Sequence, residues 1–203
     1  MALTPTFAEA HSPIQGLGTF YNHFLHPFVV PVHAMLLIAS ALMLGQQGRA
    51  GARIGLPAMA AGLLCGELAS HWLTPDGAPL SALLVGSLAV GGAVALDRKL
   101  PIALTTLTGA LVGVAVGLDS GTEALAFREN VMAVAGVSAG VVYLALVVSG
   151  LTVGAARGWR RVGVRIVGSW IVAASVLVLA LSLAGHAKRP PVATAALARA
   201  ARC

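Results

Sequence analysis

The chain has 203 residues, of which 58% are hydrophobic and only 10% are charged. This composition, with a mean hydropathy of +0.88, excludes a soluble globular domain and is typical of an integral membrane protein. The net charge of +6 does not indicate nucleic-acid binding, because the basic residues lie in short clusters between apolar runs, where they act as topology signals. Two cysteines, Cys65 and Cys203, provide neither a disulfide framework nor a CxxC metal motif.

Six apolar stretches predict an all-α, polytopic membrane protein built as a bundle of about six transmembrane helices. Each stretch is near the roughly 20 residues that a helix needs to cross a bilayer core. Residues 1–22 are expected to form an exposed lead-in, residues 23–187 the six-helix domain, and residues 188–203 a basic tail. The expected spans are about 27–45, 54–73, 78–96, 100–118, 131–151 and 166–187. In the first span a helix starting at Pro27 places proline at its first position, and Pro31 is expected to bend it.

The distribution of basic residues predicts the orientation of this bundle. The first, third and fifth loops are rich in Lys and Arg, the second loop has none, and the fourth has only Arg128. This bias predicts that the odd loops are cytoplasmic and that the N-terminus lies outside. The basic C-terminal tail then falls on the outer side, against the rule that basic segments stay on the cytoplasmic side. The basic residues of the odd loops are Arg49, Arg53, Arg98, Lys99, Arg157, Arg160, Arg161 and, just beyond, Arg165.

Glycines repeat every four residues on two of the expected helices. Gly109, Gly113 and Gly117 follow this spacing on the fourth span, and Gly136 and Gly140 follow it on the fifth. Rows of small residues let helix backbones approach closely in a membrane. We therefore expect these faces to be helix-packing surfaces.

Two ionisable residues are expected at the same depth near the outer end of the bundle. His33 lies six residues inside the first span and Glu67 six residues before the end of the second, so each is about 9 Å below the surface. Buried ionisable groups in a membrane usually have a functional role. Because consecutive spans are often neighbours, we expect His33 and Glu67 to face each other. A purely structural hydrogen bond between the two helices is the alternative.

The remaining outer polar groups predict a funnel above this pair. His23, His26 and His71 are expected at its mouth with Asp76, whereas Asp119, Glu123 and Glu129 are assigned to the outer fourth loop. Imidazole and carboxylate together suit divalent first-row cations such as nickel, cobalt or zinc. His26 and His33 are about 10.5 Å apart along an ideal helix, so they can share an ion only if Pro31 bends it. His26 could instead be an interfacial residue. The candidate metal ligands are His23, His26, His33, Glu67 and His71.

The segment from His26 to Met35 resembles the first transmembrane segment of the HupE/UreJ family, whose pattern is close to H-P-x-x-G-x-D-H-x-x-A-M. His26, Pro27 and His33 match in register, whereas Val30 and Val32 stand where the family has Gly and Asp. The resemblance implies a small multi-span protein of the bacterial inner membrane that accompanies hydrogenase or urease and moves nickel. Glu67 could supply a carboxylate from the next helix.

Two functional hypotheses follow from the sequence. The first is a permease or delivery accessory for a divalent cation, nickel or cobalt first, which acts through the outer His/Glu funnel. The second is a non-catalytic subunit packed against a larger membrane complex. A b-type haem site formed by His33 with His71 or His186 is disfavoured because these residues differ in depth. No nucleophile–base set predicts an enzyme, no organic cofactor is expected, and the expected partners are the lipid bilayer and the cation.

Overall fold

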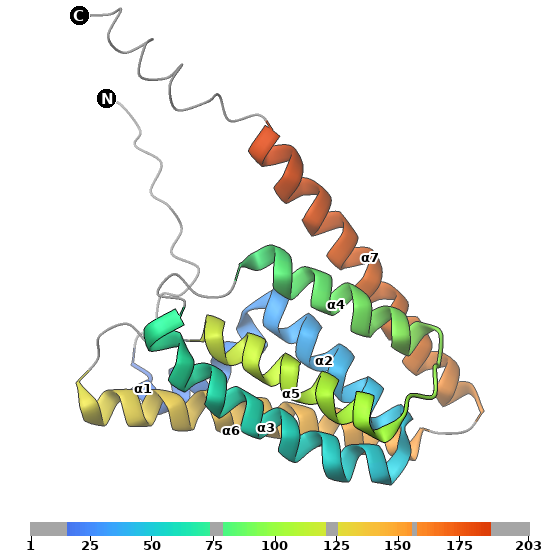
Figure 1. Cartoon of the computed structure of the whole chain (residues 1–203), viewed down its shortest axis with the longest axis horizontal. Helices are drawn as coiled ribbons and strands as arrows, with labels where there is room; N and C mark the ends of the chain where they lie inside the picture. The colour runs from blue at the N-terminus through green and yellow to red at the C-terminus, as the bar shows by residue number, and fades with distance from the viewer. Residues whose placement is uncertain (1–15, 74–78, 121–125, 156–157, 188–203) are drawn as a thin grey trace, which may run out of the picture.

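The computed structural model describes residues 16–73, 79–120, 126–155 and 158–187, and every regular element in these ranges is an α-helix (Figure 1). This confirms the predicted all-α class. The basic tail, Asp76 and Glu123 lie outside the described residues. The helices are α1 (Thr19–Val29), α2 (Pro31–Gln46), α3 (Gly48–Leu73), α4 (Leu80–Ala95), α5 (Ile102–Asp119), α6 (Phe127–Gly154) and α7 (Trp159–Ala187).

Each expected span contains a helix, but not all of these helices meet the requirements for crossing a membrane. By length and composition, four helices in the described ranges are long and apolar enough, namely α3, α5, α6 and α7. The count rises to five if α1 and α2 together form one bent span. Helix α4 is apolar but has only 16 residues. The helices therefore support a multi-pass membrane protein, while six complete spans are supported only in part.

The first expected span is broken in two. Helix α1 contains Pro27 in its interior and ends at Val29, and α2 begins at Pro31 at an angle of 72° to it. The prediction of a single helix starting at Pro27 was therefore wrong. Between the two helices, Val30 is extended, as expected for a residue that precedes proline. Proline at the first position of α2 loses no helical hydrogen bond, so the chain can restart there. Helix α1 begins at Thr19, inside the expected lead-in.

Helix α2 is the centre of the bundle. Ten of its 16 residues are buried, and it contacts the five helices from α3 to α7 (Figure 1). Around it, α5 packs most extensively on α3, α1 packs on α6, and α4 packs on α7. The apolar core consequently follows α2 along most of its length.

The glycine rows lie where helix backbones touch. A Cβ added at Gly113 would overlap the carbonyl oxygen of Met59 on α3, and one added at Gly140 would overlap that of Phe24 on α1. The other glycines of the two rows meet the same neighbouring helices in the same way. The predicted role of these faces in helix packing is confirmed.

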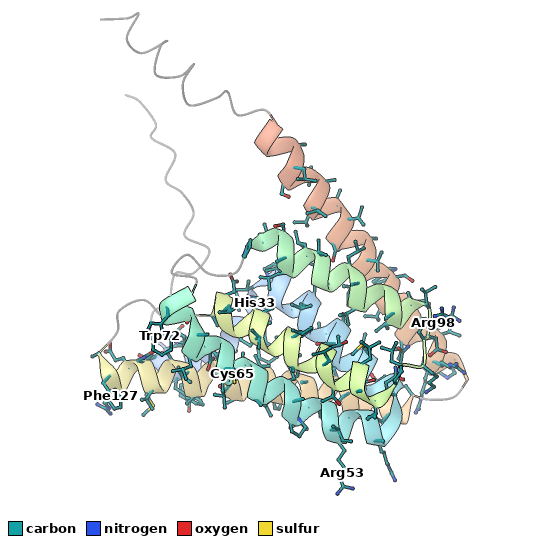
Figure 2. All side chains as sticks on the ribbon, in the orientation of Figure 1. His33, Arg53, Cys65, Trp72, Arg98 and Phe127 are labelled. Carbon is teal, nitrogen blue, oxygen red and sulfur yellow. The ribbon has the colours of Figure 1, made fainter. Side chains whose placement is uncertain are left out.

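The two ends of the bundle differ in their charge. Figure 2 shows Arg53 and Arg98 toward one end and Trp72 and Phe127 at the other. The turns α2–α3, α4–α5 and α6–α7 share the first end, which we call the basic end. The opposite end holds His33 and is called the histidine end (Figure 2). The grouping agrees with helices that run alternately up and down, and the side of the membrane that each end faces stays a prediction.

The close approach of α3 and α5 predicts a different response to the same substitution at two glycines. In Gly113→Ala the new methyl group meets the rigid backbone of α3, so the helices must separate, and we expect a loss of about 1–3 kcal/mol and a lower Tm in mild detergent. Gly92→Ala on α4 is the matched control, because a Cβ there meets no atom within 4 Å. Equal Tm values for the two variants would contradict the packing described here.

Candidate metal site

A buried histidine and a carboxylate meet at the histidine end. His33 lies in the first turn of α2, is fully buried, and its Nε2 is 2.7 Å from Oδ2 of Asp119. Asp119 is the last residue of α5, and 21% of its side chain remains exposed. The short distance is typical of a charge-assisted hydrogen bond. The pair joins α2 to α5 and leaves the carboxylate reachable from outside.

The break between α1 and α2 brings a second histidine to this pair. The ring centroids of His26 and His33 are 5.1 Å apart, with planes inclined by 59°. On a straight helix the same residues would be separated by about 10.5 Å along the axis. The bend at Pro31 therefore supplies the condition under which these two imidazoles could act together.

The pairing with Asp119 also determines which nitrogen of His33 is available. A neutral ring that donates its Nε2–H to the carboxylate keeps a lone pair on Nδ1. Nδ1 is buried and makes no hydrogen bond within the part of the chain that the structure describes. Histidines that bind metals commonly donate their other ring N–H to a carboxylate in this way. The pair thus has the chemistry of a ligand and its orienting group.

Glu67 is also buried, but its side chain bonds to a different residue. Only 6% of it is exposed, its Oε2 accepts a hydrogen bond of 3.4 Å from Oγ of Ser138 on α6, and its Oε1 has no partner among the described residues. No hydrogen bond or ion pair joins it to His33 within these residues. Among the described residues, the carboxylate that bonds to His33 is therefore Asp119 and not Glu67.

The other predicted ligands are only partly placed. His23 uses its Nδ1 within α1, 2.8 Å from the carbonyl oxygen of Thr19. His71 belongs to α3, but its side chain lies outside the described residues, as does that of His186. Within the described ranges, no group of three or more His, Cys, Asp or Glu side chains is arranged to hold a metal ion. The five-residue ligand set stays a prediction.

Asp119 and Ser138 are the polar residues that the sequence did not assign to the site. Asp119 was expected in the outer fourth loop, but α5 continues to it. It follows Gly117, the last glycine of the row that packs on α3, by two residues. Continuing that helix by one residue would have identified it, whereas Ser138 carried no comparable signal.

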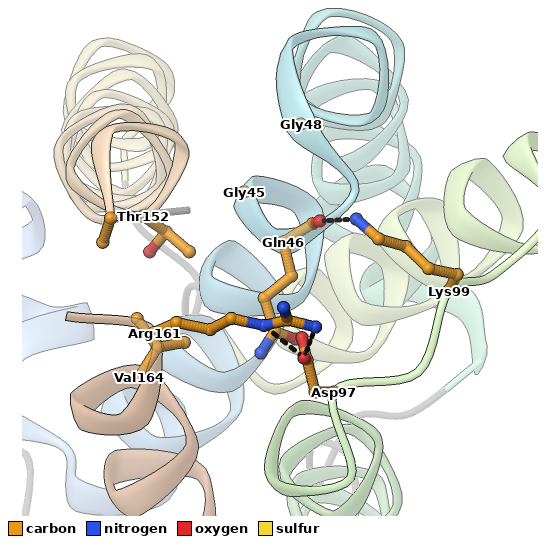
Figure 3. Close-up of a pocket in the computed structure, with 9 residues that line it drawn as sticks. Gly45, Gln46, Gly48, Asp97, Lys99, Thr152, Arg161 and Val164 are labelled. Carbon is orange, nitrogen blue, oxygen red and sulfur yellow. Dashed lines mark hydrogen bonds and ion pairs between the residues drawn. The ribbon is translucent and has the colours of Figure 1, made fainter. Parts of the chain in front are cut away.

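A second polar cluster lies at the basic end, around a cavity of about 160 Å³ (Figure 3). Asp97 forms an ion pair with Arg161, and Nζ of Lys99 donates a hydrogen bond of 2.6 Å to the carbonyl oxygen of Gln46. These contacts join the end of α2 to the α4–α5 turn and that turn to α7. Because cations dominate the cluster, it is poorly suited to bind a metal.

Comparison with known families identifies the family of this chain. The family model described as HupE / UreJ protein matches residues 1–174, which include His26, His33 and Asp119. The chain belongs to the HupE / UreJ family. HupE/UreJ proteins are accessory or transport proteins linked to nickel and cobalt handling, and they are not known as enzymes. No curated protein and no solved structure matches the chain.

The contact between His33 and Asp119 predicts energetic coupling that a double-mutant cycle can measure. For His33→Ala and Asp119→Ala, alone and combined, we expect a coupling energy of about 0.5–3 kcal/mol in the free energy of unfolding in detergent, because the residues share one hydrogen bond. The matched cycle with His33→Ala and Glu67→Gln should give a smaller value. A larger coupling to Glu67 than to Asp119 would refute this pairing.

Proposed function

We propose that this HupE/UreJ protein transports or delivers a divalent nickel or cobalt ion and that His33 is its buried ligand. The observation that carries the proposal is a fully buried imidazole held by a carboxylate and adjoined by a second imidazole. Such groups suit divalent first-row cations. Family membership supports the same class of cargo.

Asp119 contributes the negative charge that the site needs. The family pattern has an aspartate next to the histidine, where this chain has Val32. In this structure a carboxylate reaches the histidine from the far end of α5 instead. A divalent ion that leaves water for a buried position requires an anionic neighbour to offset its lost hydration. Asp119 is partly exposed and can meet the ion first, while His33 is fully buried behind it.

Two further residues, on α1 and α3, would complete the ligand set. His26 lies on a separate short helix, so a small change at the Val30 break moves its ring relative to His33 without disturbing α2. Glu67 is a further buried carboxyl group, and its Oε1 has no partner among the described residues. We assign these two residues to later steps in the passage of the ion.

Metal binding by purified variants tests the proposal. We expect His33→Ala to abolish binding of Ni²⁺ or Co²⁺, measured by calorimetry in mild detergent, because the buried ligand is lost. Asp119→Asn should weaken it by about 10–100-fold, as expected when the group orienting a ligand histidine is changed. Uptake into proteoliposomes should fall in the same order.

His23→Ala is the matched control, because the ring of His23 already bonds within its own helix. It should leave binding close to that of the unmodified protein. If His33→Ala binds Ni²⁺ and Co²⁺ as tightly as the unmodified protein, the proposed role of His33 is wrong.

The second candidate function is that of a non-catalytic subunit in a larger membrane complex. It is favoured by α7, which is the least buried of the four candidate spans and exposes Leu177, Leu181 and Leu183. Stable co-purification with a large membrane partner, together with no bound nickel or cobalt by elemental analysis, would favour this function over transport.

A further inference from the structure

An open apolar groove of about 500 Å³ runs between α3 and α6, and no histidine lines it. Its floor contains Met59, Ala145 and Ser149, all of which are buried. Leu146 and Pro57 on its rims are exposed. The groove thus opens sideways from the bundle, toward the surroundings of the helices.

Small residues explain why the groove exists. Ala60 on α3 and Ala145, Ser149 and Gly150 on α6 line it, so few side-chain atoms extend between the two helices there. A Cβ added at Gly150 would meet nothing within 4 Å. An unfilled apolar gap of this size would forfeit many dispersion contacts. A flexible apolar chain from outside the protein can restore them.

One cation stands at the mouth of the groove. Arg53, near the start of α3 at the basic end, lines it and is exposed. Its guanidinium makes no hydrogen bond or ion pair within the described residues. From Arg53 to Ala60 the helix rises about 10.5 Å, so the charge lies at the membrane edge of an otherwise apolar trough. This combination matches an amphiphile with an anionic head and an apolar tail.

We propose that the groove binds an anionic glycerophospholipid, with its phosphate on Arg53 and one acyl chain along Met59 and Ala145. Basic pockets between helices on the cytoplasmic side of membranes bind such head groups, and the charge bias predicts this side for the basic end. A second copy of the chain fits less well, because a two-fold interface here would add a second Arg53 and the groove lining supplies no carboxylate to pair with either. The proposal does not depend on metal transport.

The test compares lipids on the delipidated full-length protein in mild detergent. Phosphatidylglycerol should raise the Tm and remain bound in native mass spectrometry, phosphatidylcholine should do so less, and inorganic phosphate alone should have no effect. Arg53→Gln should lower the affinity for phosphatidylglycerol about fivefold, to near that for phosphatidylcholine, since a basic residue near the surface contributes about that factor.

Arg49→Gln is the matched control, because Arg49 is exposed one turn earlier on α3 and does not line the groove. It should retain the preference for phosphatidylglycerol. Ala60→Trp fills the trough and should weaken both lipids; Arg53→Gln alone decides the question if that variant does not fold. Equal losses in Arg49→Gln and Arg53→Gln, no preference between the two lipids, or a dimer cross-linked through Arg53→Cys would overturn the proposal.

Discussion

The backbone break between Val29 and Pro31 is the constraint on which the arrangement depends. The extended Val30 and the proline that follows it turn the chain by 72°, so that α1 packs on α6 while α2 enters the centre of the bundle. Without this turn, His26 and His33 would be stacked along one helix at a distance too great for a shared ion. With it, their rings adjoin, and His33 is buried at the point where α2 meets the end of α5. A local effect of proline thereby determines which residues, although far apart in the chain, can meet in the structure.

The sequence predicted the helices and the histidine end better than the contacts between them. The turn of α1 into α2 was anticipated as a bend at Pro31, since proline acts on its own neighbourhood, and the glycine rows correctly indicated helix packing. The carboxylate that bonds to His33 was misassigned: α2 does contact α3, as expected of consecutive helices, but Glu67 on α3 bonds to Ser138 on α6. Helix α5, drawn onto α3 by its glycines, instead presents Asp119 to α2. Such a contact between residues 86 apart depends on the packing of whole helices, which no local pattern contains.

The buried residues of α2 between His33 and the basic end are almost all apolar, which bears on the movement of any ion along this helix. Beyond His33 toward the basic end, the buried residues of α2 are apolar except for Ser40, whose hydroxyl already donates to its own helix. These residues of α2 offer a divalent ion no charged ligand, so its desolvation beside them would be costly. If the protein carries an ion as proposed, passage along α2 would require this helix to move relative to its neighbours. The ion pair and hydrogen bonds around Asp97 and Lys99 oppose such a movement, because they tie α2, α4 and α7 together.

Two of the basic residues that predict topology also donate hydrogen bonds to carbonyl oxygens at helix C-termini. A helix leaves its last carbonyl oxygens without internal partners, and its C-terminus carries partial negative charge. At the basic end, Lys99 donates to the carbonyl oxygen of Gln46 at the end of α2, and Arg165 donates to that of Ala95 at the end of α4. Gln46 in turn donates to the carbonyl oxygen of Val94. Cations at this end thus neutralise helix termini in addition to marking a membrane side. Arg53 differs from them because it sits near the start of α3 and has no partner within the described residues, so an anion from outside the protein is the group that suits it.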